Sequence, residues 1–233
     1  MRLNGYIVLV CGGTGGLGRE VVNRFLKNGA TVVTNYRRES SFVELKSGVV
    51  YPERLEGIEA DLGTESGVIK FFEDFKRNHQ RLDAYLHLMG GFWMGGELSE
   101  TPLGKWEKML QMNLTSAFLS CRAALGIMKK QSHGKIFTIA AKAALDLPAG
   151  MGAYAVSKAG VLALTEILAK EGKPYNIQVN SLLPSIIDTP ANREAMPEAN
   201  FKEWVSPAQI GELLVALTGV EQTVLNETAL KVY

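Results

Sequence analysis

Residues 6–18 read YIVLVCGGTGGLG, and this stretch decides the fold. Its first five residues form an unbroken apolar run, which is typical of a strand buried on both faces. The run leads directly into glycines spaced as Gly12-x-x-x-Gly16-x-Gly18. Apolar residues then recur with a helical period, and a second apolar run follows at 30–34. This order of strand, glycine-rich turn, helix and strand is the opening unit of a doubly wound parallel sheet.

The same alternation continues to the end of the chain. Further strands are expected at 57–60, 82–89, 135–140, 175–181 and 228–232, with helices through 68–75, 103–130 and 150–170. The pattern predicts a Rossmann-type α/β fold with about seven parallel strands in a three-layer α/β/α arrangement, and a single domain over residues 1–233. Residues 183–206 contain prolines and show no clear period. A loop of that length in a compact domain is typical of a lid or a substrate-binding loop.

Composition narrows the class of protein. The 233 residues are 46% hydrophobic and 21% charged, which is enough apolar material for a sizeable core. The formal net charge of +1 favours neither nucleic acid nor a membrane surface as a partner. Cys11 and Cys121 lie in apolar contexts, and no run has the length of a signal peptide core or a membrane span, so a cytoplasmic location is expected. His79, His87 and His133 lack metal-ligand spacing, so no metal site is expected, and His87 is interpreted as a core residue.

The glycine-rich turn is a candidate dinucleotide site. Glycines at this point let the turn tighten and let a pyrophosphate approach the backbone at the positive end of the following helix. Gly12, Thr14, Gly16, Leu17 and Gly18 are therefore candidate cofactor-binding residues. The alternative is a turn with a purely structural role.

The end of the second strand carries the choice between NADH and NADPH. It reads Tyr36-Arg37-Arg38 and contains no carboxylate. A guanidinium matches the 2′-phosphate of NADPH with two hydrogen bonds, whereas a carboxylate would repel it. NADPH is therefore favoured and NADH remains possible; alternatively, the two arginines are ordinary surface charges. Asp61, with Leu62 beside it, follows the third strand, where its carboxylate can accept from the adenine amino group.

Residues 150–160, GMGAYAVSKAG, hold a candidate acid–base pair. A helix would place Tyr154 and Lys158 on one face, four residues apart. An ammonium beside a phenol favours the phenolate, so we expect the pKa of Tyr154 to fall. Ser157 is expected to point away from Tyr154. The alternative is a Tyr packed on the helix with a solvated Lys nearby.

The glycine turn, Asn113 within the long helix and Tyr154-x-x-x-Lys158 together resemble the short-chain dehydrogenase/reductase family over nearly the whole chain. The resemblance implies an NAD(P)H-dependent oxidoreductase with Tyr154 as its acid/base. It implies that Lys158 binds the nicotinamide ribose and that Asn113 holds a water of the proton relay. It further implies a homodimer or homotetramer formed through the long helices. The cofactor residues implied by the resemblance also include Gly90, Gly91, Pro184, Ile187 and Thr189.

One family residue is missing. The serine expected about thirteen residues before the Tyr is replaced by Ala141. The segments AKAALD at 141–146 and GGFWMGG at 90–96, with residues 183–199, resemble the dihydropteridine reductase branch of the family. That resemblance implies reduction of a quinonoid dihydropterin, whose electron-poor ring needs less polarisation than a ketone. Phe92 or Trp93 would stack on the pterin, and the sequence leaves open which one.

Two points remain open at this level. The mammalian-type members of that branch favour NADH, whereas the charges of Arg37 and Arg38 favour NADPH. The alternatives for function are a general carbonyl or 3-oxoacyl reductase, against which Ala141 argues, and a non-catalytic NADP(H)-sensing protein, against which the intact Tyr154, Lys158 and Asn113 argue.

Overall fold

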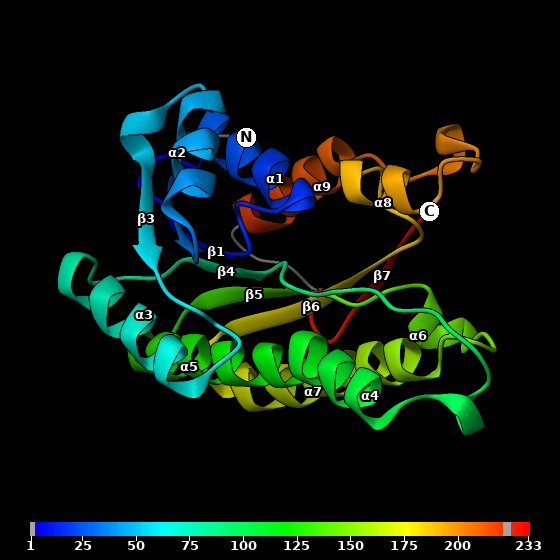
Figure 1. The fold of residues 1–233 in the computed structure, drawn as a ribbon. Helices are drawn as coiled ribbons and strands as arrows, with labels where there is room; N and C mark the ends of the chain where they lie inside the picture. The colour runs from blue at the N-terminus through cyan, green and yellow to red at the C-terminus, as the bar shows by residue number, and fades with distance from the viewer. Residues whose placement is uncertain (1–2, 221–224) are drawn as a thin grey trace.

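The computed structural model describes residues 3–220 and 225–233. Its centre is one sheet of seven parallel strands in the order β3-β2-β1-β4-β5-β6-β7 (Figure 1). The strands are β1 Ile7–Cys11, β2 Thr31–Tyr36, β3 Leu55–Glu59, β4 Ala84–His87, β5 Gly134–Ile139, β6 Ile177–Pro184 and β7 Ala229–Val232. The strand order reverses between β1 and β4, so the predicted doubly wound Rossmann-type sheet is confirmed.

Helices cover both faces of the sheet (Figure 1). One layer contains α1 Gly16–Lys27, α2 Glu39–Gly48, α8 Pro190–Ala195 and α9 Pro207–Gly219. The other contains α3 Glu65–Asn78, α4 Leu103–Met109, α5 Ser116–Gln131, α6 Ala143–Asp146 and α7 Gly152–Gly172. Four of these helices, α2, α6, α8 and α9, were not among the elements predicted from the sequence. The sequence does contain a start signal for α9, because Ser206 and Gln209 form a capping box around Pro207.

The first strand shows why its apolar run is unbroken. Val8 and Val10 pack into the core beneath α1 and α9, together with Phe25 and Leu214. Leu9, one residue between them, packs on the opposite face in the core beneath α3 and α5. Successive side chains of a strand point to opposite faces, so a strand covered on both sides has no polar position.

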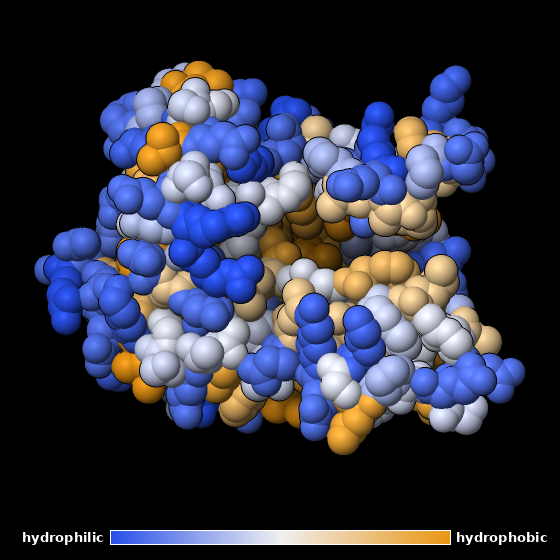
Figure 2. Space-filling model, in the orientation of Figure 1, coloured by the Kyte–Doolittle hydropathy of each residue, from blue (hydrophilic) through white to orange (hydrophobic). Residues whose placement is uncertain are grey.

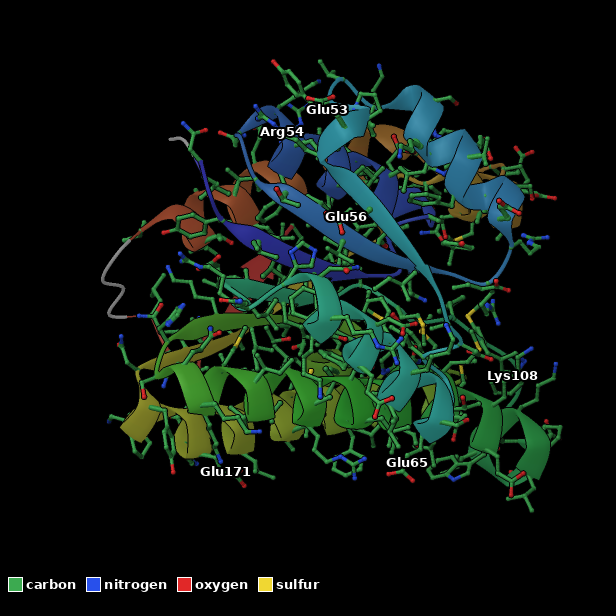
Figure 3. All side chains as sticks on the ribbon, turned by 90° about the vertical axis from the view of Figure 1, so that its left-hand side faces the viewer. Glu53, Arg54, Glu56, Glu65, Lys108 and Glu171 are labelled. Atoms are coloured by element: carbon green, nitrogen blue, oxygen red, sulfur yellow. The ribbon has the colours of Figure 1, made fainter. Side chains whose placement is uncertain are left out.

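The outer surfaces of the layers carry charged side chains. Glu65, Lys108 and Glu171 are exposed and point outward from the helices below the sheet (Figure 3). Between the two layers, the face seen in Figure 2 is hollowed, and apolar atoms form the bottom of the hollow. An apolar recess of this kind is the usual form of a ligand site.

The helix expected at 103–130 contains an irregularity. α4 and α5 are joined by a π-helical turn, Leu110–Thr115, with Asn113 inside it. Periodicity could not reveal this turn, because over a single turn an apolar pattern does not distinguish i→i+5 from i→i+4 hydrogen bonds.

Residues 183–206 are more ordered than their sequence suggested. Leu183 and Pro184 belong to β6, and α8 begins after Thr189, whose side chain accepts from the amide of Asn192. Ile187 pairs with Val205, which closes the segment at its base. The absence of a clear period reflects several short elements rather than an irregular loop.

One helical stretch, Gly152–Tyr175, is long and apolar enough to cross a membrane by length and composition alone. The sequence analysis expected no such run. In this fold, the α7 part of the stretch packs against the sheet, and its buried residues include Ser157, Lys158 and Thr165. Its apolar side chains are partly buried in the core and partly exposed, as Ile167 is.

The Gly18→Ala substitution tests the glycine turn. A Cβ at Gly18 would lie 2.1 Å from the carbonyl oxygen of Gly12, which is rigid backbone. We expect the free energy of unfolding to fall by about 2 kcal/mol or more, measured by urea denaturation. Gly48→Ala is the matched control, because a Cβ there meets nothing within 4 Å. An equal loss in both variants would contradict the packing argument.

Candidate active site

The predicted site residues gather at the carboxyl ends of the strands. The glycine turn follows β1, Gly90 and Gly91 follow β4, Ala141 follows β5, and Pro184 ends β6. In open parallel sheets, ligands bind outside this edge, where the strand order reverses.

The glycine turn is tightly packed on its neighbours. Gly12 has a φ of +87°, which favours glycine. Its amide donates to Oδ1 of Asn35 at 2.9 Å, and the amide of Gly13 donates to Oγ1 of Thr34 at 3.1 Å. A Cβ at Gly13 would lie 2.3 Å from that oxygen. Gly13, Thr34 and Asn35 are thus structural partners of the turn that sequence reasoning missed, because their contacts cross between strands.

The first turn of α1 is suited to an anion. Gly15, its N-cap, provides no side-chain acceptor for the helix amides. Amides at a helix start carry partial positive charge and can bind phosphate. Arg19 anchors the loop, since Nε donates to the carbonyl of Thr14 at 3.0 Å and the guanidinium pairs with Glu44 at 2.8 Å. The side chain of Leu17, a predicted cofactor residue, packs in the core, so a contact with cofactor would involve its backbone.

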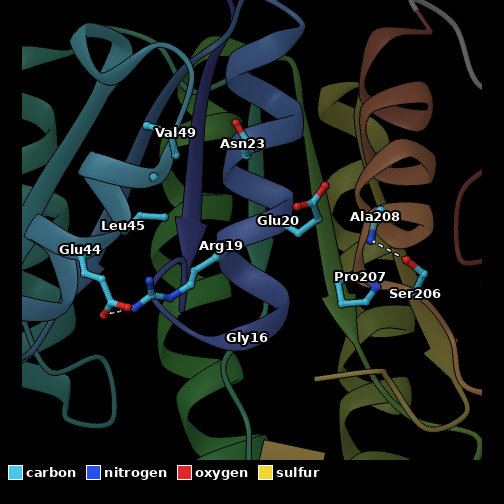
Figure 4. A pocket seen from close by; sticks show the side chains of 11 residues that line it. Gly16, Arg19, Glu20, Asn23, Glu44, Leu45, Val49, Ser206, Pro207 and Ala208 are labelled. Carbon is cyan, nitrogen blue, oxygen red and sulfur yellow. Dashed lines mark hydrogen bonds and ion pairs between the residues drawn. The ribbon is translucent and has the colours of Figure 1, made fainter. Parts of the chain in front are cut away.

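A cavity of about 420 Å³ lies between α1, α2 and the start of α9 (Figure 4). It is lined by Gly16, Arg19, Glu20, Asn23, Glu44, Leu45, Gly48, Val49, Ser206, Pro207 and Ala208. Of the predicted site residues, only Gly16 is among them. The candidate active site is therefore defined by the side chains at the sheet edge and not by this cavity.

Two arginines follow the end of β2. Arg37 and Arg38 are exposed, and neither forms an ion pair within the described part of the chain. Tyr36 stacks on Phe42, with ring centroids 5.1 Å apart. Across the next strand, Oδ1 of Asp61 already accepts from the amide of Gly63 at 3.0 Å, but the residue is exposed.

Asn113 joins three segments. Its Oδ1 accepts from the amide of Gly91 at 2.8 Å, while its Nδ2 donates to the carbonyl of Gly91 at 3.1 Å and to Oγ of Ser157 at 2.9 Å. Ser157 in turn donates to the carbonyl of Tyr154 at 2.7 Å. The sequence placed Ser157 away from Tyr154, yet its hydroxyl links Asn113 to the Tyr154 backbone. Its role was missed because the partner lies 44 residues away.

Lys158 and Tyr154 have pKa values that differ from expectation. Lys158 is buried, and Nζ donates to the carbonyl of Ile139 at 2.8 Å. Burial lowers the pKa of Lys158 to about 8, and burial raises the pKa of Tyr154 to about 12. The predicted fall in the Tyr154 pKa is therefore wrong for this structure, because desolvation of the phenolate dominates. A Cβ at Gly90 would lie 2.8 Å from Oδ1 of Asn113 and 3.1 Å from Nζ of Lys158, so a side chain there would crowd this polar cluster.

The three predicted substrate residues lie in different surroundings. Phe92 is 48% exposed and meets Tyr154 edge to face, with ring centroids 5.0 Å apart. Trp93 instead lies over Gly95, where a Cβ would be 2.6 Å from the indole. Phe92 is thus the ring beside Tyr154. Ala141 is buried, and it lies two residues after Ile139, whose carbonyl accepts a hydrogen bond from Lys158.

The segment after β6 reaches the glycine turn. A Cβ on Gly16 would lie 3.0 Å from Cβ of Thr189, so these two residues are in contact range. The short segment from Pro184 to Thr189, which includes Ile187, therefore connects the sheet edge to the start of α1. Within residues 3–220 and 225–233, no group of three or more His, Cys, Asp or Glu side chains is placed to hold a metal ion.

Comparison with known proteins identifies the family. The family model for short chain dehydrogenase matches residues 6–200, so the chain belongs to the short-chain dehydrogenase family of oxidoreductases. It is 32% identical to dihydropteridine reductase of Dictyostelium discoideum, over 89% of this chain and 85% of that protein. It is 30% identical to 3-oxoacyl-acyl-carrier-protein reductase FabG of Chlamydia pneumoniae, over 91% and 85%. A solved short chain dehydrogenase from Shigella flexneri 2a strain 301, complexed with NADP, is 26% identical and superposes with a TM-score of 0.89 over 98% of this chain and 97% of that one.

The Lys158→Met substitution tests the cost of the buried ammonium. The pKa of Lys158 is lowered on folding, so the unfolded chain binds more protons between pH 8 and 10.5 and the parent gains stability across that window. The variant lacks this titration. We expect it to be more stable than the parent at pH 7 by up to about 3 kcal/mol, and the difference to shrink by pH 10.

Urea denaturation at pH 7 and pH 10 measures this difference. Lys135 has a pKa lowered to about 8 as well, but it is present in both proteins and cancels. A stability difference that is independent of pH would show that Lys158 is not a buried cation at pH 7.

Proposed function

We propose that this protein reduces a quinonoid dihydropterin to the tetrahydropterin, with NADPH favoured over NADH. The carrying observation is the combination of Ala141 and Phe92 beside Tyr154. Ala141 offers no hydroxyl to a developing oxyanion, whereas Phe92 adds an aromatic surface next to the proposed acid. A conjugated, electron-poor ring suits this environment better than a ketone does. The relationship to a dihydropteridine reductase at 32% identity supports the proposal.

The cofactor would lie along the carboxyl edge of β1 and β4. The amides at the start of α1 and the glycine turn suit a pyrophosphate, and Gly90 and Gly91 leave room beside Lys158. Asp61 and the Leu62 backbone would lie at the adenine end, and Pro184, Ile187 and Thr189 at the nicotinamide end. When bound, NADPH supplies the hydride.

Tyr154 would supply the proton. Its pKa of about 12 keeps the phenol protonated at neutral pH, which is the form that an acid in a reduction requires. Lys158, whose pKa is about 8, would hold the ribose with its ammonium and ease proton loss from Tyr154. Asn113 would keep this helix, the Gly90-Gly91 turn and the relay in register.

A steady-state assay tests the proposal. NADPH oxidation is followed with freshly generated quinonoid dihydropterin and, separately, with an acetoacetyl thioester. Preferential turnover of the pterin supports the assignment. Faster turnover of the thioester would favour the second candidate, a 3-oxoacyl reductase, which the relationship to FabG supports and Ala141 opposes. Binding of NADPH without turnover of either compound would favour a sensing protein.

The Tyr154→Phe substitution tests the acid. Removal of the phenol hydroxyl should lower kcat for the quinonoid pterin at least a hundredfold, because no other proton donor is assigned to this site. The Kd for NADPH, measured by fluorescence titration, should change little. Retention of kcat within a few-fold of the parent would mean that Tyr154 is not the acid.

The Arg37→Ala and Arg38→Ala substitutions test cofactor choice. Both guanidiniums are exposed and unpaired within the described residues, so either can bind a 2′-phosphate. At least one variant should raise the Kd for NADPH by roughly tenfold and leave that for NADH unchanged. Arg77→Ala is the control, because that side chain pairs with Asp74 on α3. Equal effects on both cofactors would remove the case for NADPH preference.

A dimer is the proposed assembly, and the substrate is a small molecule rather than nucleic acid or membrane. Phe118 of α5 and Val156 and Ile167 of α7 are exposed apolar side chains on the two helices that the family uses for dimers. Burying them against a second copy would remove this apolar surface from water.

A further inference from the structure

A buried histidine lies directly beneath the polar cluster of the site. His87 is the last residue of β4 and is 2% exposed. Its Nδ1 is 3.1 Å from the hydroxyl of Tyr85, and its Nε2 is 3.3 Å from Oγ of Ser116, the first residue of α5. None of these three side chains has a role in the reaction proposed above.

The positions of the protons follow from the partners. The Ser116 hydroxyl donates its single proton to the carbonyl of Met112 at 2.7 Å. Toward His87 it can therefore only accept, so the ring proton lies on Nε2 and Nδ1 accepts from Tyr85. The ring is neutral, because burial and the nearby Lys158 ammonium lower the pKa of His87 to about 3.

This chain of hydrogen bonds ends inside the π-helical turn. The carbonyl of Met112 belongs to that turn, and the next residue is Asn113. In a regular α-helix the amide of residue 116 would bind this carbonyl. Here that amide donates to the carbonyl of Gln111 instead, and the Ser116 hydroxyl binds the carbonyl of Met112. π-turns are rare and are found where function needs them, so specific support for one is informative.

We propose that His87 is a positioning residue that acts through Ser116 to hold the π-turn, and thereby the orientation of Asn113 toward Gly91 and Ser157. The Asn113 side chain forms hydrogen bonds with Gly91 and Ser157. The turn that carries it is bound through the carbonyl of Met112 to Ser116, which in turn contacts His87. The functional consequence rests on the proposed function, because it assumes that Asn113 serves the reaction. The structural consequence does not.

Four variants separate the link from general packing. His87→Leu removes the donor to Ser116, and His87→Gln keeps an N–H close to the position of Nε2. Tyr85→Phe removes the partner of Nδ1, together with the contacts of that hydroxyl with Cys11 and Ser120, and leaves the link to Ser116 intact. Ser116→Ala breaks the link with a smaller change of volume, and it serves as the decisive variant if His87→Leu does not fold.

The first readout is hydrogen exchange at the amide of Gly91, which donates to Asn113. We expect exchange about tenfold faster in His87→Leu and Ser116→Ala, the size of one lost hydrogen bond, and within threefold of the parent in His87→Gln and Tyr85→Phe. The amide of Val33, in the core strand β2, reports global opening. Unchanged Gly91 exchange, or a change equal to that at Val33, would overturn the proposal.

The second readout is the division between kcat and KM. The same two variants should lower kcat for the substrate that the parent reduces while the KM for NADPH stays within twofold, and His87→Gln should restore kcat. A loss of stability with unchanged kcat would reduce His87 to a packing residue. If the parent reduces neither pterin nor thioester, the proposed function fails, and the exchange result at Gly91 still decides the role of His87.

Discussion

The hydrogen bonds of the Asn113 side chain are the constraint on which the site depends. One amide group binds both backbone groups of Gly91 and the hydroxyl of Ser157, so it fixes the loop after β4 against α7. A buried amide costs free energy unless its donors and acceptor are all used, and here they are. The turn after β4 and the helix carrying Tyr154 therefore cannot shift separately without leaving buried polar atoms unpaired. Asn113 thereby fixes the position of the loop after β4 relative to α7.

Burial of the ionisable groups next to Asn113 lowers the stability of the folded protein. The Lys158 ammonium is buried with a backbone carbonyl as its hydrogen-bond acceptor, and the Tyr154 phenolate is disfavoured by the same lack of water. Each pKa shift toward the neutral form is the effect of desolvation. Lys158, with a pKa of about 8, is still a cation at pH 7, and Tyr154 keeps its proton until another group lowers its pKa. Functional sites often retain such a cost in stability.

The sequence predicted the fold well because its signals are local. Apolar runs locate strands whose two faces are both covered, and the glycines locate a turn where the backbone has no room for a Cβ, as the 2.1 Å approach at Gly18 shows. The site was predictable as a list of residues but not as a set of contacts. Whether Ser157 meets Asn113, whether a π-turn replaces an α-turn, and whether burial outweighs a neighbouring charge at Tyr154 all depend on packing between segments far apart in the chain. The contact of Gly13 with Thr34 escaped notice for the same reason.

The missing serine and the aromatic neighbour are best understood together. A hydroxyl at position 141 would be worth most to a substrate that develops charge on one oxygen, since a preorganised donor stabilises that charge in a site without water. A ring that is already electron-poor spreads the incoming electron pair over several atoms, so a single donor gains it little. Contact with a flat apolar surface then matters more, and Phe92 provides such a surface at 5.0 Å from the Tyr154 ring. Under the proposed function, the alanine at position 141 and the exposed Phe92 meet the same demand, that of a planar substrate bound through its ring face rather than through one polar atom.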